Sequence, residues 1–136
     1  MLLTNTGLRK ESTPEDVAPS EMVIPTSGIN PLFGEAEFPP KVRALTIEEI
    51  HVIKETRGDA AVGAKEAGFD ALELQAVEGN LLVRFTSPFA NRRKDEYGGA
   101  LKNQTRLLVE AVANIKGRVG KDFPLICRIA GIDLVP

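Results

Sequence analysis

The sequence predicts an α/β fold in which parallel strands are joined by crossover helices. Two stretches with helical spacing of apolar residues, 46–67 and 100–119, are each followed by a short apolar run, 71–77 and 123–131. A glycine stands at the end of each helical stretch, where a helix commonly stops. Strands that alternate with helices in this way pair in parallel within one sheet, through right-handed crossovers.

Length and composition indicate a single domain and exclude several functional classes. The chain has 136 residues, which we interpret as one unit, 1–136, and 43% of them are apolar, enough for a core. The net charge of −2 argues against a nucleic-acid binder. With Cys127 as the only cysteine, no internal disulfide forms. No apolar run is long enough for a leader or a membrane span, so we expect a soluble cytoplasmic protein without membrane or nucleic-acid partners.

The first third of the chain is expected to hold little regular structure. Leu2–Leu3 is interpreted as a very short strand. Residues 11–45 contain most of the prolines and are predicted to be an irregular loop region that can include a small hairpin. Structureless segments of this length are usually functional or disordered.

A long helix is predicted to begin at Thr46. The sequence "TIEE" is a capping-box pattern, in which Thr46 caps the helix and Glu49 reaches back to it. Gly58 is expected to weaken the helix by about 1 kcal/mol relative to alanine. Gly68 is expected to end it.

The second half repeats the pattern after a long polar loop. Residues 80–85 are predicted to form a helical turn, and the loop "SPFANRRKDEYGGALKNQTR" follows over 87–106. A second amphipathic helix is predicted from about Ala100 to Gly120.

The strand over 71–77 is predicted to have two chemically different faces. Side chains alternate along a strand, so one face should pack against helices and consists of Leu72, Leu74 and Ala76. The other face should line the interior and consists of Glu73, Gln75 and Val77. Gln75 and Val77 lie at the carboxyl end of the strand, where α/β barrels build their active sites.

The last strand is predicted to alternate in the same way. Its apolar face consists of Leu125, Cys127 and Ile129, and its interior face of Ile126, Arg128 and Ala130. We expect Cys127 to be a core residue and not a nucleophile. Arg128 in the interior needs an anionic partner, which is either Glu73 or a ligand.

The segments "AGFDALEL", "GNLL" and "FTSPFANRRKDEYGGALKNQTR" resemble the fourth-strand region of the old yellow enzyme family of FMN-dependent oxidoreductases. "DFPLICRIAG" resembles the fifth strand of that family, and "APSEM" and "VRALTIEEI" resemble segments upstream. The resemblance extends from about residue 18 to residue 131. It implies a partial (β/α)8 TIM barrel, roughly strands three to five with two crossover helices.

The resemblance also implies an activity, two cofactors and three site residues. In the family, hydride passes from NAD(P)H to FMN and then to an activated alkene or similar small-molecule acceptor. Arg128 matches the arginine that lies against the flavin and stabilises its negative charge on reduction. Gln75 and Glu78 occupy the positions of the family's two substrate-binding side chains.

Several residues depart from the family pattern. Gln75 and Glu78 stand where the family has His-x-x-His or His-x-x-Asn, Asn80 replaces a tyrosine, and Leu2 replaces a flavin-contacting glutamine. An ionised Glu78 would repel an enolate-like oxygen. We therefore expect a truncated oxidoreductase that is weak or inactive alone. The alternatives are a non-catalytic half-barrel that self-associates through open sheet edges or binds a partner, a sheet that binds another small anion at Arg128, and a decayed gene product.

The remaining motifs are expected to be structural. Arg93, Asp95 and Arg106 are predicted to tie the polar loop together, and Tyr97 with its two following glycines to shape it. His51, the only histidine, is expected to be a solvated helix residue, so we predict no metal site. The "RGD" at 57–59 falls inside a predicted helix and is weak evidence for adhesion.

Overall fold

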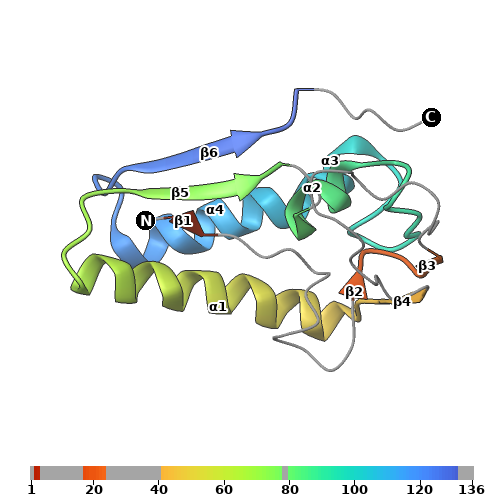
Figure 1. Cartoon of the computed structure of the whole chain (residues 1–136), viewed down its shortest axis with the longest axis horizontal. Coiled ribbons are helices and arrows are strands. Elements are labelled where there is room, and N and C mark those ends of the chain that lie inside the picture. The colour runs from red at the N-terminus through yellow and green to blue at the C-terminus, as the bar shows by residue number, and fades with distance from the viewer. Residues whose placement is uncertain (1, 4–16, 24–40, 78–79, 132–136) are drawn as a thin grey trace, which may run out of the picture.

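The computed structural model describes residues 2–3, 17–23, 41–77 and 80–131. Within them, two three-stranded sheets are accompanied by two long helices (Figure 1). The larger sheet has the order β1-β5-β6, with β1 at Leu2–Leu3, β5 at Leu72–Ala76 and β6 at Leu125–Ile129. All its pairings are parallel, as the alternation of strands and helices predicted.

Helix α1, Ile47–Glu66, begins with the predicted capping box. The backbone N–H of Glu49 donates to Thr46 Oγ1 over 3.2 Å, and the backbone N–H of Thr46 donates to Glu49 Oε2 over 2.8 Å. These two bonds satisfy groups that the first helical turn leaves unpaired. After the helix, Gly68 has a φ of 85°, a conformation that favours glycine.

The helical turn predicted at 80–85 is present as α2, Leu81–Thr86. The second predicted helix forms as two pieces, α3 at Leu101–Gln104 and α4 at Arg106–Val119. The break falls at Thr105, whose Oγ1 donates to the carbonyl oxygens of Leu101 at 2.9 Å and Lys102 at 3.3 Å. Such hydroxyl-to-carbonyl bonds inside a helix bend it.

Helices α1 and α4 approach each other closely at Gly58. A Cβ built there would lie 2.0 Å from Asn114 Oδ1 and 2.6 Å from Arg118 Nε. Arg118 forms ion pairs with Glu55 and Asp59, and Asn114 Nδ2 donates to both Glu55 oxygens over 3.2 and 3.1 Å. The glycine that weakens α1 as an isolated helix therefore makes room for a polar network that joins it to α4.

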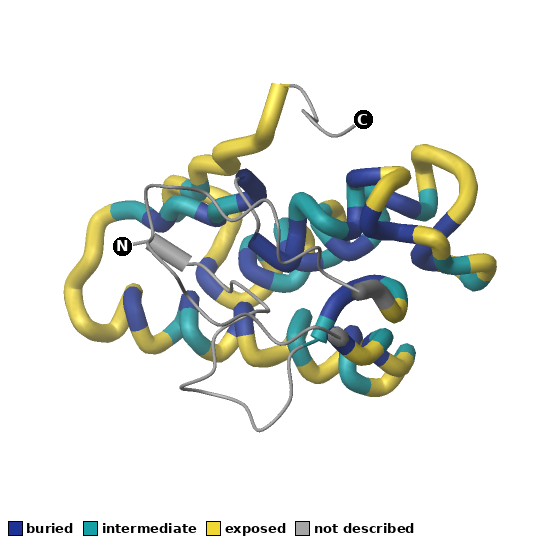
Figure 2. Tube along the Cα trace, turned by 45° about the vertical axis from the view of Figure 1, so that its right-hand side comes forward, coloured by how far each residue is buried: buried dark blue, intermediate teal, exposed yellow. Residues whose placement is uncertain are grey.

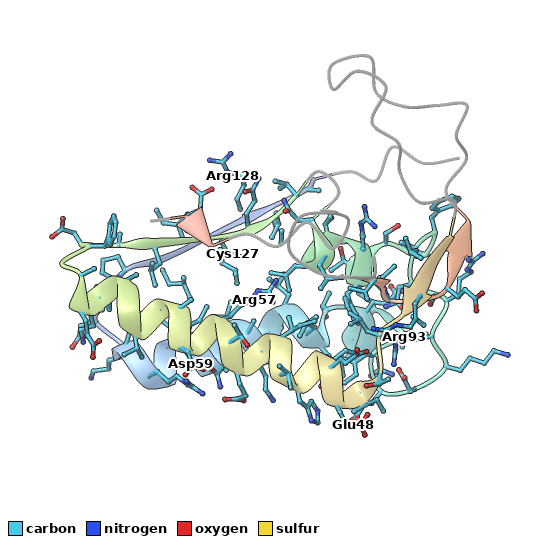
Figure 3. The ribbon with its side chains drawn as sticks, turned by 60° about the horizontal axis from the view of Figure 1, so that its bottom comes forward. Glu48, Arg57, Asp59, Arg93, Cys127 and Arg128 are labelled. Atoms are coloured by element: carbon cyan, nitrogen blue, oxygen red, sulfur yellow. The ribbon has the colours of Figure 1, made fainter. Side chains whose placement is uncertain are left out.

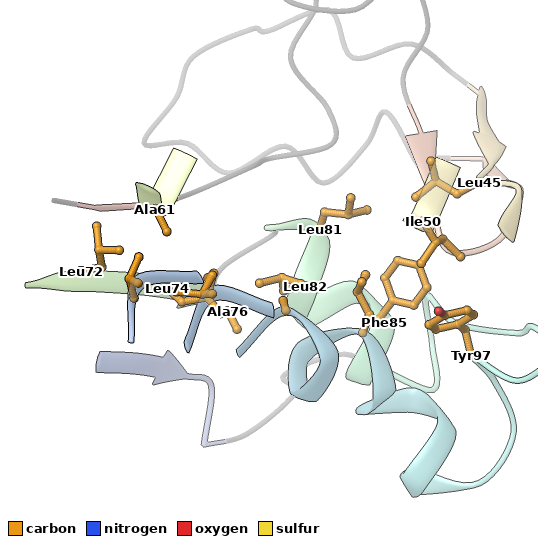
Figure 4. Packing of buried hydrophobic residues seen from close by; sticks show 14 of the residues in the cluster. Leu45, Ile50, Ala61, Leu72, Leu74, Ala76, Leu81, Leu82, Phe85 and Tyr97 are labelled. Carbon is orange, nitrogen blue, oxygen red and sulfur yellow. The ribbon is translucent and has the colours of Figure 1, made fainter. Parts of the chain in front are cut away.

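The core lies between the larger sheet and these helices. One face of β5 is fully covered, because Leu72, Leu74 and Ala76 are at most 2% exposed. Figure 4 shows how they continue into the side chains of α2 and the polar loop, which include Leu81, Leu82, Phe85 and Tyr97. The predicted helix-facing side of β5 is confirmed.

The smaller sheet is formed by segments that flank residues 24–40, which lie outside the described part. Its order is β2-β4-β3, with β2 at Val17–Ala18, β3 at Met22–Val23 and β4 at Lys41–Ala44. β3 and β4 are antiparallel and β2 and β4 are parallel. The described ends of the predicted 11–45 region therefore contain a small antiparallel pair, as the sequence allowed.

Candidate functional site

The face of the larger sheet that does not pack against α1 and α4 carries the polar residues that the sequence singled out. Gln75 on β5 is the register partner of Arg128 on β6, and Glu73 is the register partner of Ile126. Register partners on parallel neighbours project to the same side of a sheet, so these four residues share one face, here called the open face. Figure 3 shows Arg128 on the side of the sheet away from α1.

Glu73, one of the two partners that the sequence left open for Arg128, forms an ion pair with it. Arg128 Nε lies 2.9 Å from Glu73 Oε1, and Nη2 donates to Oε2 over 3.2 Å. Glu73 Oε1 is buried and accepts no well-aligned hydrogen bond from the described residues, although Nε is close. The predicted burial of Arg128 is wrong, because 60% of its side chain is exposed. Its guanidinium is thus oriented by Glu73 while the side chain stays largely exposed.

The carboxyl end of β5 is described only in part. Gln75 is half-buried beside Arg128, and Val77 is buried. Glu78 lies outside the described residues. Asn80 is buried, and its Nδ2 donates to the carbonyl oxygen of Val77 over 2.6 Å. The side chain at the family's tyrosine position therefore bonds the backbone at the carboxyl end of β5.

The predicted core role of Cys127 is also wrong. Cys127 is exposed, and partial covering of its sulphur raises the pKa of the thiol. Ile129 is 63% exposed on the same strand. The reason is that β6 is an edge strand of the described sheet. In Figure 2 most of this strand is coloured as exposed. Successive side chains of β6 point to opposite faces, as the sequence predicted, but no described element packs over this strand.

The polar loop is tied together by Arg93, Asp95 and Arg106, as predicted. Arg93 Nη2 lies 2.6 Å from Asp95 Oδ2. Arg106 Nε donates to the carbonyl oxygen of Glu96 over 2.7 Å. Sequence reasoning missed Asn91, which is 3% exposed and donates from Nδ2 to the carbonyl oxygens of Phe85 and Tyr97 over 2.7 and 2.8 Å. The signal that could have found it is the place of this asparagine in the loop motif that resembles the family.

Tyr97 anchors the same loop in the core. It is 1% exposed, and its hydroxyl donates to Glu110 Oε2 over 3.0 Å. Burial, together with the bond to Glu110, raises the pKa of Tyr97 to about 12. A Cβ at Gly98 would lie 2.2 Å from the carbonyl oxygen of Arg93, and Gly99 has a φ of 79°. These contacts are structural, as the sequence indicated.

The other motifs do not form sites in the described residues. Arg57 of the "RGD" triplet is only 8% exposed, and burial lowers its pKa to about 10, so the triplet is not presented as a recognition loop. His51 is exposed on α1, as expected. Among the residues that the structure describes, no group of His, Cys, Asp and Glu could hold a metal ion, and no helix is long and apolar enough to cross a membrane.

The sequence matches the NADH:flavin oxidoreductase / NADH oxidase family over residues 3–135. The chain belongs to this family. Membership confirms the resemblance to old yellow enzyme and, at the level of the family, FMN as cofactor and NAD(P)H as reductant.

Individual relatives agree with this assignment. A cinnamate reductase of Clostridium sporogenes is 48% identical over 87 residues, which cover 63% of this chain and 13% of the relative. An NADPH dehydrogenase of Clostridium acetobutylicum is 36% identical over 96% of this chain and 36% of its own length. The chain thus spans about a third or less of these curated relatives.

Solved structures confirm the fold. A 2-naphthoyl-CoA reductase in complex with 2-naphthoyl-CoA superposes with a TM-score of 0.79 at 32% identity, over 98% of this chain and 18% of that chain. An old yellow enzyme homologue from Zymomonas mobilis gives a TM-score of 0.68 at 32% identity, over 83% of this chain and 32% of its own. The predicted partial (β/α)8 barrel is confirmed.

The open face fits the electron-rich edge of a flavin in its donor chemistry. Arg128 presents an exposed cation there, Gln75 presents an amide beside it, and Ile126 is 57% exposed and offers apolar contact. The Glu73 carboxylate supplies the negative charge that keeps the guanidinium in place, through the ion pair between Oε1 and Arg128 Nε. This combination of a fixed cation, an amide and an apolar surface suits a planar ring system with one polar edge.

Proposed function

We propose that residues 1–136 act as one unit of the barrel of an FMN-dependent NAD(P)H oxidoreductase that reduces an activated alkene or similar small molecule. The observation that supports it is the in-register pair of Gln75 and Arg128 on the open face of parallel strands, in a chain that belongs to this family. When bound, FMN supplies the two-electron chemistry that links NAD(P)H to the acceptor.

In this proposal each site residue has a separate role. Arg128 donates hydrogen bonds to the electron-rich edge of the flavin and stabilises the charge that reduction places there. Glu73 orients Arg128 through the contacts at 2.9 and 3.2 Å. Gln75 donates its amide N–H to the acceptor oxygen, and Glu78 occupies the second substrate-binding position.

The proposed activity is weak, for a reason that lies in the side chains. Oxyanion stabilisation requires hydrogen-bond donors. Gln75 supplies such a donor, whereas Glu78 supplies one only when it is protonated. Replacing Glu78 with glutamine is therefore expected to raise the rate of acceptor reduction. An unchanged rate would show that Glu78 has no part in substrate binding.

A titration of the purified chain with FMN tests the proposal, with flavin fluorescence and visible absorbance as readouts. We expect saturable binding in the micromolar range or tighter, about −8 kcal/mol or better. Replacing Arg128 with methionine should weaken binding by at least about tenfold, because a charge-assisted hydrogen bond is lost. The matched control is Arg43→Met, which removes another exposed arginine that is paired with a glutamate, Glu49. Equal affinities for all three proteins, or no binding, would contradict the proposal.

A second candidate function is self-association through β6. This strand is at the edge of the described sheet and exposes Ile126 and Ile129 at 57% and 63%. Edges of this kind pair with another strand, and a second copy offers the same edge. Sedimentation should then show dimers that Ile129→Lys dissociates. A monodisperse wild-type monomer at high concentration would rule this out.

A further inference from the structure

The guanidinium of Arg93 bonds two backbone carbonyl groups that are distant in sequence. Nη1 donates to the carbonyl oxygen of Pro19 over 2.7 Å and to that of Leu45 over 2.6 Å. Pro19 directly follows β2, and Leu45 directly follows β4. One side chain therefore joins the backbone just after β2 to the backbone just after β4; this arrangement is here called the Arg93 clamp.

The rest of the guanidinium is fixed by the polar loop. Nε donates to both oxygens of Asp95 over 3.1 and 3.0 Å, and Nη2 donates to Oδ2 over 2.6 Å. Asp95 also accepts from the backbone N–H of Tyr97 over 3.0 Å. The bonds from Arg93 hold the pKa of Asp95 below its usual range, so the carboxylate stays charged. Only 9% of the Arg93 side chain is exposed, so its fork has one orientation.

The neighbouring residue joins the same segment with a weaker attachment. The backbone N–H of Arg92 donates to Ser20 Oγ over 2.9 Å, and its exposed side chain donates from Nη2 to the carbonyl oxygen of Glu21 over 2.8 Å. The smaller sheet itself is closed by the backbone N–H of Leu45, which donates to the carbonyl oxygen of Ala18 over 2.9 Å. Hydrogen bonds from Arg92 and Arg93 of the polar loop thus hold the smaller sheet in place.

The smaller sheet lies at the end of the molecule toward which β5 and β6 point (Figures 1 and 3). The carboxyl ends of parallel barrel strands are the end at which barrel enzymes bind their substrates. A support that sets this sheet in place therefore also sets the position of a structure at the same end of the molecule as the proposed acceptor site.

We infer that Arg93 is a positioning residue, which ties the ends of β2 and β4 to the polar loop and so holds the smaller sheet at the end of the molecule that carries the proposed acceptor site. The acceptor half of this inference rests on the proposed function. A residue with a merely structural role would lower the stability of the whole chain evenly. A positioning residue instead loosens the smaller sheet selectively.

Hydrogen exchange of the full chain tests the clamp without any ligand. In Arg93→Met, the amide of Leu45 and those of β4 should exchange at least about tenfold faster, because two partly buried charge-assisted bonds are lost. Amides of β5 and α4 should keep their wild-type rates. The control is Lys94→Met, which removes an exposed cation one residue along the loop and should change neither set.

A second variant guards against loss of folding. Asp95→Asn keeps the size of the side chain but removes the charge that orients Arg93, and it should accelerate the same amides by a smaller factor. The clamp is overturned if Arg93→Met leaves the smaller sheet unchanged, or if β5, α4 and the smaller sheet accelerate equally.

The acceptor half is tested on FMN-loaded protein with 2-cyclohexen-1-one, an activated alkene, as the probe. Arg93→Met should raise KM for the alkene by at least about fivefold with kcat and the Kd of FMN nearly unchanged. An unchanged KM would show that the smaller sheet positions nothing for the acceptor. Failure of the wild-type chain to bind FMN would instead overturn the proposed function and the acceptor half with it, and hydrogen exchange would still decide whether the clamp exists.

Discussion

Strands β5 and β6 are register neighbours of equal length in one sheet, yet they have opposite surroundings. On β5, alternate residues are fully buried by the helices, whereas no residue of β6 is buried. The amino-acid patterns are alike, with LELQA in one strand and LICRI in the other. The difference teaches that alternation specifies which residues share a face, while the neighbouring elements decide whether that face is covered.

The largest expected effect comes from truncating a covered side chain and its uncovered counterpart. Leu74 is 0% exposed, so Leu74→Ala should lower the free energy of unfolding by about 2–5 kcal/mol. Ile129 is 63% exposed, and Ile129→Ala should change it by about 0.5 kcal/mol or less. Urea denaturation followed by circular dichroism measures both. Equal losses would mean that β6 is covered in solution and would favour its association with another strand.

Two glycines of α1, one of the helices that cover β5, allow the same comparison between a crowded and an open position. Gly58→Ala should destabilise the chain by about 1–3 kcal/mol, because the added Cβ meets Asn114 Oδ1 at 2.0 Å and displaces the network to α4. Gly63 has open space around its Cβ position, so Gly63→Ala should stabilise the same helix by up to about 1 kcal/mol. Thermal denaturation of the two variants should shift in opposite directions. A stabilising Gly58→Ala would show that α1 and α4 are not closely packed there.

The smallest effect concerns an exposed ion pair at the start of α1. Bonds from the Arg43 side chain, together with the backbone N–H of Thr46, lower the pKa of Glu49 from 4.5 to about 2. A lowered carboxyl pKa adds stability above the unfolded value, and this stability is lost as the pH falls from about 4.5 to about 2. The side chain is 39% exposed, so solvent screening limits the contribution to about 0.5–1 kcal/mol.

The pH dependence of unfolding measures this contribution. The difference in unfolding free energy between the wild type and Glu49→Gln should be constant above about pH 5 and should approach zero near pH 2. In an Arg43→Met background the difference should shrink at neutral pH as well. A difference that is independent of pH would show that the charge of Glu49 contributes nothing to stability.

Local patterns predicted the elements because their causes are local. The capping box at Thr46 and the glycine stop at Gly68 depend on residues a few positions apart. The faces of β5 and the pairing of Glu73 with Arg128 followed from alternation and from the cost of an unpaired charge. Through these residues the sequence predicted most of the described fold and the composition of the open face.

The remaining features depend on contacts that no short pattern encodes. The exposure of Cys127 depends on what lies beside β6 and not on the strand itself. The sequence indicates only that Gly58 lowers helix stability. The structure shows that its missing side chain leaves room for Asn114 of α4. The carbonyl partners of Arg93 carry no side-chain signal at all, because any residue type has a backbone carbonyl. The roles of Gln75 and Glu78 stay predictions.

The Arg93 clamp also has a consequence for the order in which the chain folds. Its two carbonyl partners are 74 and 48 residues away along the sequence. Closing such long loops is entropically costly, so these bonds form after the local helices and near the end of folding. Interactions that are absent from the transition state mainly slow unfolding. Loss of Arg93 is therefore expected to speed the unfolding of the chain more than it slows its folding.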